Sequence, residues 1–415
     1  MTTPPPNSCK DMGRAPGETV FMATPVNGDS KRIHVASSEI VRDINKRVVL
    51  NLLRERQPIS RADLARASGL QRSTISLIVE ELIGEKWILE GPTVPLPRGR
   101  RPTFLRLNEE RVIIGIDVRP TQTTIALADV NGQFSSTEVI DTPADPHAGI
   151  EALTAAILRM KRECGARKIE GVGVSLSGRL HRDSERLAFA PNLKWAGVDI
   201  RKPLEEATGL EVQLENAANA CVLAAVWFDH TPCRNLVVVT VSEGIGTGML
   251  VNGQLARGLS GLAGEFGHVP LDPKGPECSC GSRGCWEVFG SNRAALRYYF
   301  ERRRSVEPDL TFQRLMTRAD ENDVHAAGAL DRMAQELGRG MRMVVAGLDP
   351  EEILVVGDLT RSWQRFGPVI SREVESQVLP GGLTPRLKPV HEGGMARLRG
   401  TVALVLQKHF AGVED

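Results

Sequence analysis

The segment LVVVTVSEGIGTGMLVNGQL at residues 236–255 repeats a plan that already occurs in VIIGIDVRPTQTTIALADVNGQF at residues 112–134. Each segment contains an apolar run of strand length, a break, a second strand-like run and an Asn-Gly pair, which favours a tight hairpin turn. The Asn-Gly pairs at 131–132 and 252–253 lie 121 residues apart. Because internal repetition indicates duplicated units, the sequence predicts two α/β lobes of the actin-like, ribonuclease H-like architecture, with a ligand cleft between them. Two unrelated α/β domains are the alternative.

The segments that follow each repeat alternate between strand-like and helix-like patterns. Apolar strand-like runs occur at 168–176 and 351–359, and the segment at 397–410 has a helical pattern. We therefore assign a first lobe to residues 108–235 and a second lobe to residues 236–415. We expect the C-terminal helix to return to the first lobe.

Length and composition are those of a globular chain with two or three domains. Of 415 residues, 41% are hydrophobic and 25% are charged, and there is no apolar run of the roughly 20 residues that a membrane span requires. Residues 1–30 begin with a Pro-rich stretch and lack the apolar core of a signal peptide, so we expect a disordered leader. Seven cysteines without an export signal indicate the reducing cytoplasm. We expect no membrane partner.

The net charge of +1 conceals a basic region at residues 31–107. That region contains 15 Lys and Arg against 8 Asp and Glu, so the rest of the chain is net acidic. A basic module joined to an acidic body indicates a head that binds a polyanion such as DNA.

The basic region also has the pattern of a winged helix-turn-helix. Its first helix is predicted from an apolar stripe that should face the core, namely Ile40, Ile44, Val48 and Leu52. Ser60 is a predicted N-cap for a second helix at residues 61–67, and Gly69 is expected to end that helix. A tight glycine turn after a short helix is typical of this motif.

The third helix is predicted to enter the major groove of DNA. It runs to about Ile83, is capped by Gln71 or Ser73, and should bury Ile75, Ile78, Val79 and Leu82. Its outward polar residues suit contacts with bases and phosphates, and they are Gln71, Arg72, Ser73, Thr74 and Ser76. Strand-like runs at 87–90 and 103–107 flank a basic wing tip, formed by Arg98, Arg100 and Arg101. A small helical bundle for protein contacts is the alternative.

The stretch GEFGHVPLDPKGPECSCGSRGCWE at 264–287 contains Glu-x-Gly-His followed by Cys-x-Cys-Gly-x-x-Gly-Cys-x-Glu. With APNLKW at 190–195, ENAANA at 215–220 and GIGTG at 244–248, it resembles the ROK family, whose members include transcriptional repressors and sugar kinases. The resemblance covers nearly all of the chain after the leader, and the stretch at 264–287 is its most specific part. The head and its GRRP wing resemble the repressor branch, since the family's kinases begin directly at the first lobe.

Within that match, one histidine and three cysteines form a compact set of metal ligands: His268, Cys278, Cys280 and Cys285. One nitrogen and three thiolates make a closed tetrahedral set typical of structural zinc, with no open position for a catalytic water. A DNA-binding finger would need a base-reading helix between its ligand pairs, and a Pro- and Gly-rich loop stands there instead. We therefore predict one structural zinc per chain.

The resemblance implies a sugar site in the cleft. Its residues, carried over from the family's sugar sites, are Asn192, Asn216, Glu265, His268 and Glu287. Carboxylates and amides on rigid support suit sugar hydroxyl groups. The alternative for the two glutamates is that they only support the metal ligands.

Three departures from the kinase pattern argue against catalysis. The kinases have a general-base aspartate where this chain has Ala217, so no catalytic residue is assigned. Arg119 and Pro120 stand in the first phosphate loop, where the kinases have glycine, and Glu243 in the second loop would repel a triphosphate. GIGTG alone is weak evidence for nucleotide binding.

The sequence thus predicts a DNA-binding regulator, most simply a repressor of carbohydrate-related genes, that is not an enzyme. The expected partners are a double-stranded DNA operator, a sugar or sugar derivative as effector, and other copies of the chain in a dimer or a dimer of dimers. Two alternatives stay open: an ATP-dependent sugar kinase with a DNA-binding head, and a regulator without a sugar effector.

Overall fold

The structure is a computed structural model that describes residues 38–410 except 94–102, 182–186, 191, 194, 196, 230, 377–381 and 391–392. The chain divides into two compact units, Met1–Arg42 and Asp43–Asp415. Of the first unit, only the start of helix α1 (Ser38–Arg56) is described. The expected disordered leader at residues 1–30 lies outside the described residues.

The head contains α1, α2 (Arg61–Ser68) and α3 (Arg72–Gly84) beside a three-stranded sheet. That sheet has the order β1-β3-β2, from β1 (Ile59–Ser60), β3 (Thr103–Leu107) and β2 (Ile88–Thr93). Both capping predictions for α2 are confirmed. The Ser60 hydroxyl accepts a hydrogen bond from the Asp63 N–H at 3.2 Å, and Gly69 ends the helix with a φ of 73°.

Helix α3 buries the four apolar residues that its pattern predicted. Gln71 occupies the N-cap position, but its side chain makes no capping hydrogen bond. Of the two predicted caps, Gln71 therefore holds the cap position without a side-chain cap, and Ser73 lies inside the helix.

The predicted core stripe of α1 is wrong. Ile44 is 45% exposed and Val48 is 38% exposed, whereas Val49, Leu50 and Leu53 are buried. Leu52 is partly buried against the core, and the side chain of Ile40 is not described. The segment VVLNLL has apolar residues on adjacent faces of one helix, so periodicity alone left the choice between them open.

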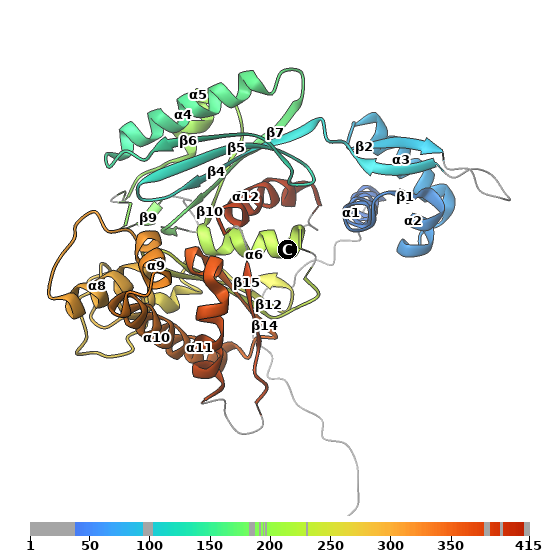
Figure 1. Cartoon of the computed structure of the whole chain (residues 1–415). Coiled ribbons are helices and arrows are strands. Elements are labelled where there is room, and N and C mark those ends of the chain that lie inside the picture. The colour runs from blue at the N-terminus through green and yellow to red at the C-terminus, as the bar shows by residue number, and fades with distance from the viewer. Residues whose placement is uncertain are drawn as a thin grey trace, which may run out of the picture. The chain divides into compact units, whose positions relative to one another are not determined.

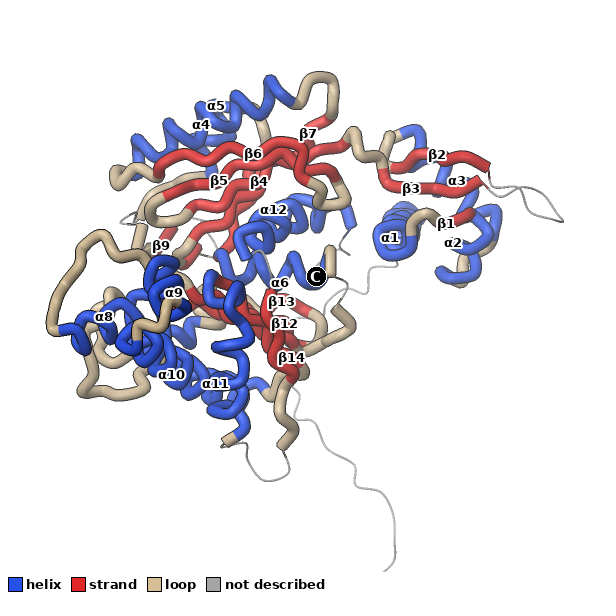
Figure 2. Tube along the Cα trace, viewed as in Figure 1, coloured by secondary structure: helices blue, strands red, loops and turns tan. Residues whose placement is uncertain are grey.

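The body has two five-stranded sheets with the same topology (Figures 1 and 2). The first has the order β10-β7-β4-β5-β6 and the second has the order β15-β14-β11-β12-β13. In each, an antiparallel hairpin is extended on one side by two parallel strands. The first sheet contains β4 (Arg111–Val118), β5 (Gln122–Asp129), β6 (Phe134–Asp141), β7 (Lys168–Leu176) and β10 (Val212–Asn216). The second contains β11 (Leu236–Val241), β12 (Ile245–Val251), β13 (Gln254–Leu255), β14 (Glu352–Gly357) and β15 (Arg386–Val390).

This duplication confirms the predicted actin-like body behind a helix-turn-helix head. Lobe 1 denotes the first sheet with α4 (Pro146–Glu163) and α5 (Arg201–Thr208), which share its core. Lobe 2 denotes the second sheet and its helices, which are α7 (Glu287–Gly290), α8 (Asn292–Arg303), α9 (Phe312–Asp320), α10 (Val324–Leu348) and α11 (Trp363–Glu375). A short hairpin of β8 (Arg179–Leu180) and β9 (Leu187–Phe189) belongs to lobe 1.

Two helices, α6 (Ala217–Trp227) and α12 (Gly393–Phe410), lie between the two sheets (Figure 1). Helix α6 follows a lobe 1 strand but packs against β11 and β12 of lobe 2. Helix α12 follows a lobe 2 strand but packs against β4 and β7 of lobe 1, and also against α6. Each lobe therefore covers its inner face with a helix that comes from the other half of the chain.

The close approach of these two helices depends on small residues. A Cβ at Gly400 of α12 would overlap the carbonyl oxygen of Ala220 in α6. A Cβ at Gly173 of β7 would likewise overlap the backbone of Thr401. Glycine is required at both positions because the neighbouring atoms are backbone and cannot rotate away.

Gly400→Val should therefore lower the free energy of unfolding by about 1–3 kcal/mol, the usual cost of overpacking a tight interior. Urea denaturation followed by circular dichroism measures this change. Gly84→Ala is the matched control, because an added Cβ there meets no atom within 4 Å. A Gly400→Val protein as stable as the wild type would contradict the close approach of the helices.

Candidate functional site

A cavity of about 1120 Å³ lies between the lobes. Its walls come from the end of β10, the first turn of α6, the turn between β11 and β12, the segment before the cysteine loop, and α12. All five predicted sugar residues line it: Asn192, Asn216, Glu265, His268 and Glu287. Segments far apart in the sequence thus converge on one concave site.

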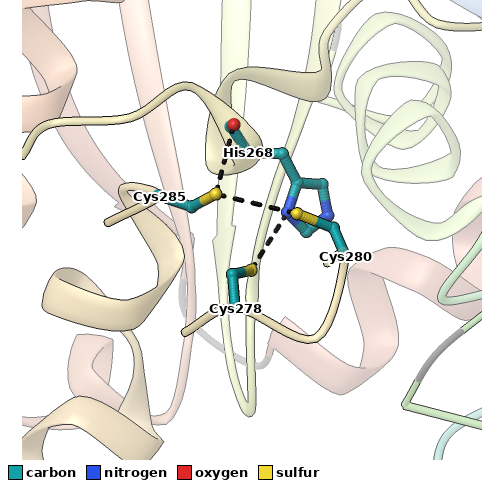
Figure 3. Close-up of side chains that lie close together, drawn as sticks. All are labelled: His268, Cys278, Cys280 and Cys285. Carbon is teal, nitrogen blue, oxygen red and sulfur yellow. Dashed lines mark hydrogen bonds between the residues drawn. The ribbon is translucent and has the colours of Figure 1, made fainter. Parts of the chain in front are cut away.

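The predicted metal ligands form a cluster (Figure 3), of which His268 and Cys280 line the cavity. One ligand atom from each of His268, Cys278, Cys280 and Cys285 lies within 4.8 Å of every other. The Cys278 sulfur lies 3.5 Å from Nδ1 of His268, and the Cys280 and Cys285 sulfurs lie 3.7 Å apart. The structure therefore brings together the four side chains that the spacing singled out.

These separations fit a zinc ion. In a tetrahedron with Zn–S near 2.3 Å and Zn–N near 2.0–2.1 Å, two sulfurs lie about 3.8 Å apart, and sulfur lies about 3.6 Å from nitrogen. These two separations agree with the tetrahedral values to about 0.1 Å, and the other ligand pairs lie within 4.8 Å. A metal held there would tie the loop at residues 278–285 to the 3₁₀ helix η1 (Glu265–His268).

The pKa values of the three thiols in the cluster are shifted in different directions. Burial raises the pKa of Cys278 and of Cys285. Burial also opposes ionisation of Cys280, but hydrogen bonds from Ser282 and from the neighbouring thiols outweigh it and lower the pKa of Cys280. A metal ion needs thiolates, so its binding would release protons from the buried thiols.

The two nitrogens of His268 face different partners. Nδ1 lies toward the Cys278 sulfur, whereas Nε2 lies 3.8 Å from a carboxylate oxygen of Glu265. Burial raises the pKa of Glu265, although the charges of His268 and Arg179 act in the opposite direction. One imidazole can therefore bind a metal through Nδ1 and present Nε2–H to a ligand in the cavity, so the two roles predicted for His268 are compatible.

Glu287 connects the cysteine loop to the glycine loop. One of its carboxylate oxygens accepts a hydrogen bond from the Ile245 N–H at 3.2 Å. The other lies 3.6 Å from the Cys278 sulfur and 3.4 Å from the Ser279 hydroxyl. A Cβ at Gly244 would overlap this carboxylate. Its contacts place Glu287 in support of the cluster as well as at the cavity wall.

The two predicted asparagines are already engaged in hydrogen bonds. Asn216 caps α6 by accepting from the Ala218 N–H at 2.8 Å, and its amide donates to the Gly178 carbonyl at 2.9 Å. The amide oxygen of Asn192 accepts from the Arg293 guanidinium at 2.8 Å. This last bond crosses from lobe 1 to α8 of lobe 2. A ligand at Asn192 therefore competes with, or adds to, a contact between the lobes.

Ala217 lies at the start of α6 and lines the cavity without any group that could accept a proton. The neighbouring carboxylate of Glu215 is not available as a substitute. It pairs with Arg257 at 2.9 Å and accepts a hydrogen bond from Asn219 at 2.9 Å.

The segment predicted to correspond to the first phosphate loop of the kinases contains a charged side chain, Arg119. Arg119 donates to the Asp117 carboxylate at 2.7 Å, and Ser175 donates to its other oxygen at 2.7 Å. Burial opposes the charge on Arg119, but Asp117, Asp358 and Glu243 raise its pKa. The guanidinium of Arg119 thus neutralises the carboxylate of Asp117 by a direct hydrogen bond.

The outward face of α3 presents the predicted DNA-contacting residues to solvent. Gln71, Arg72 and Ser73 are exposed, and Thr74 and Ser76 are half-buried. The Ser76 hydroxyl donates to the Arg72 carbonyl at 3.0 Å, inside the helix. The predicted wing residues Arg98, Arg100 and Arg101 lie outside the described residues.

Comparison with known proteins places these features in one group. The family model described as ROK family matches residues 113–408. The chain belongs to the ROK family. A xylose repressor of Bacillus spizizenii is 30% identical over 387 residues, which cover 91% of this chain and 99% of the repressor. A glucokinase of Streptomyces coelicolor is 30% identical over 269 residues, which cover 60% of this chain and 82% of the glucokinase.

A solved structure shares the fold over most of the chain. It is a ROK family transcriptional regulator described as a homologue of the Escherichia coli MLC protein. It aligns with a TM-score of 0.76 and 23% identity over 89% of this chain and 98% of that chain. The family thus contains regulators and kinases on one scaffold, and the site residues must distinguish them.

Several residues of this ROK site were missed by the sequence analysis. Arg179 and Arg397 line the cavity, Arg257 neutralises Glu215, and Arg293 holds Asn192. Arg397 is buried 3.9 Å from Asp117, and its Nε has no hydrogen-bond partner among the described residues. No sequence signal distinguished these arginines from the many others, because their roles depend on contacts between distant segments.

Cys280→Ser should reduce bound zinc from one ion per chain to a trace and lower the unfolding temperature, because site assembly is coupled to folding. Elemental analysis and differential scanning calorimetry measure the two effects. Cys164→Ser is the control, since Cys164 is buried in lobe 1 away from the cluster. Fully folded, metal-free wild-type protein would refute the structural role of the ion.

Proposed function

We propose that this chain is a sugar-responsive transcriptional repressor that binds DNA through its head and does not transfer phosphate. The observation that carries the proposal is one chain with both a helix-turn-helix and a ROK cleft that lacks the catalytic base at Ala217. The xylose repressor that matches over nearly the full length supports the same function.

The chemistry of the cleft supports binding without catalysis. Phosphoryl transfer needs a positioned base, backbone donors for the phosphates and neutralised charge. The position of the base is Ala217, its neighbour Glu215 is already paired, and the Arg119 side chain stands where backbone should approach phosphate. The residues that we propose as partners of sugar hydroxyl groups, by contrast, line the cavity.

We assign the metal of the cluster as zinc, with a structural role. Four protein ligands fill a tetrahedron and leave no position for substrate or water. When bound, the ion would hold Nδ1 of His268 and thereby fix the ring whose Nε2 faces Glu265. The chain's own residues, not the metal, would then contact the sugar.

The cell compartment and assembly follow from the same chemistry. The six described cysteines are all free thiols, which suits the reducing cytoplasm. No described helix is long and apolar enough to span a membrane. A single winged head offers a small DNA interface, so we infer that two chains bind a pseudo-palindromic operator together.

Substitutions in the head should separate affinity from sequence preference. Gln71→Ala should change the bases selected from a randomised DNA library, at a cost of roughly 1–3 kcal/mol on the preferred site. The double variant Arg100→Ala, Arg101→Ala should weaken binding to all sites and flatten the salt dependence by about 0.9 for each lost phosphate contact. Fluorescence anisotropy at several salt concentrations measures both effects.

Arg314→Ala on α9 is the control for charge, because it removes an exposed arginine of the body. If the wing variant kept the wild-type affinity and salt slope, the wing would not contact DNA. A library that yields no selected sequence would contradict the proposed function itself.

The wild type should bind a mono- or amino-sugar but show no ATP-dependent phosphorylation of it. Ala217→Asp should also be inactive, because Arg119, Pro120 and Glu243 still obstruct the nucleotide. Calorimetric titration and a coupled kinase assay measure the two properties on one sugar panel. Wild-type turnover would establish the kinase alternative, and a protein that binds no sugar would favour the regulator without a sugar effector.

A further inference from the structure

We propose that Arg111 is the positioning residue through which ligand binding in the cleft reaches the recognition helix. The proposal rests on the proposed function and adds a specific route between its two sites. Arg111 is the first residue of β4, at the end of that strand remote from the cleft. Its contacts form what we call the junction cluster, which consists of Arg111, Glu170, Trp87, His409 and Phe410.

The guanidinium of Arg111 holds the segment that follows the recognition helix. Its Nε donates to the Lys86 carbonyl at 2.8 Å, and a terminal nitrogen donates to the Glu85 carbonyl. Glu85 is the C-cap of α3. The same guanidinium lies over the Trp87 ring, 3.9 Å from its centroid. The Arg111 side chain thus contacts three consecutive residues after α3, Glu85 to Trp87.

Arg111 is also anchored within lobe 1. Its other terminal nitrogen pairs with Glu170 of β7, and both side chains are only 4% exposed. A buried guanidinium with three directional contacts cannot move without breaking hydrogen bonds in a medium that offers no water in exchange. The end of α3 must therefore follow any movement of β4 and β7.

Helix α12 reaches the same cluster from its C-terminal end. His409 packs on Trp87 with ring centroids 4.6 Å apart, and its Nε2 lies 3.7 Å from Glu170. The Phe410 ring lies edge-on to Trp87 at 5.8 Å, and the Phe410 carbonyl accepts from Asn51 of α1 at 2.9 Å. The start of β4, the start of β7 and the end of α12 thus meet at the junction cluster, where they contact the head.

The opposite ends of β4 and β7 lie at the cleft, whereas α12 borders the cavity from Arg397 to Lys408, the residue before His409, and Arg47 of α1 also lines it. Strand β4 runs on to Arg119 and Pro120, and β7 leads to Ser177 and Gly178. Helix α12 places Arg397 in the cavity wall. The path along β4 is roughly 23 Å, and the path from Arg397 to His409 is about 18 Å of helix. Pro120, Ser177, Gly178 and Arg397 all line the cavity.

The route is stiff along its length. Helix α12 packs so closely on β7 that a Cβ at Gly173 would overlap the backbone of Thr401. A Cβ at Gly115 of β4 would come within 2.6 Å of the Thr401 hydroxyl. Close-packed interiors shift between discrete arrangements instead of deforming smoothly. Movement of lobe 1 on ligand binding would therefore be delivered to the junction cluster and so to α3.

The test separates coupling from stability and from intrinsic affinity. The double variant Arg111→Met, Glu170→Met removes both partners of the buried pair, a change that interiors commonly tolerate. Calorimetry gives its sugar affinity, and anisotropy gives its operator affinity with and without saturating sugar. The ratio of the two operator affinities is the coupling factor, about 5- to 150-fold in typical allosteric proteins.

We expect the double variant to keep sugar and operator affinities within about threefold of the wild type, while its coupling factor falls toward one. Arg111→Lys is a second variant that keeps the charge and should uncouple too, because an ammonium lacks the planar fork of donors. The control is Arg342→Met, Glu373→Met, which removes an ion pair between α10 and α11 of lobe 2. It should leave the coupling factor unchanged.

A folded double variant, or a folded Arg111→Lys protein, with the wild-type coupling factor would overturn the proposal. A wild type whose operator affinity ignores every sugar that it binds would overturn both this proposal and the proposed function. Because the second outcome concerns the wild type and the first concerns only the variants, the two failures are distinguishable.

Discussion

The close approach of α12 to α6 is the constraint on which the rest of the structure depends. Because Gly400 has no side chain, its backbone packs directly against the backbone of Ala220 in α6. The two helices lie between sheets that belong to different halves of the chain. Because each helix covers the sheet of the opposite half, neither lobe has a complete core by itself. Residues of both helices line the cleft, and the last residue of α12, Phe410, accepts a hydrogen bond from Asn51 of the head.

The cysteine loop has a local role within this frame. Loops have little packing of their own, yet this one borders the cavity and supplies Glu287 to its wall. A metal bound by His268 and the three cysteines would hold this loop in place through four coordinate bonds, where other segments are held by hydrophobic packing. The same histidine faces Glu265 through its other nitrogen, so rigidity of the loop and geometry of the ligand site are linked through a single ring.

The family contains repressors and kinases, and besides its head this chain departs from the kinase pattern at a few side chains of the cleft. The cleft contains amides and carboxylates that we propose bind sugar hydroxyl groups, while Ala217 cannot accept a proton and Arg119 pairs with Asp117. Sugar binding needs only the amides and carboxylates of the cleft. Catalysis also needs a general base and groups that bind the phosphates. A regulator can therefore arise when the base and the phosphate-binding groups are lost, provided that the head is attached to a part of the body that moves.

The sequence by itself determined the local features: the Asn-Gly hairpins of the repeat, the Ser60 and Gly69 caps, and the compact set of one histidine and three cysteines. These depend on backbone preferences and on ligand chemistry over short distances. Only the tertiary structure decided which face of α1 is buried, that Asn192 is held by Arg293, and that Arg111 joins β4 to the end of α3. Such contacts join residues that are far apart in the chain. The same arginine in a different packing would be an ordinary surface charge, so no local pattern can specify its role.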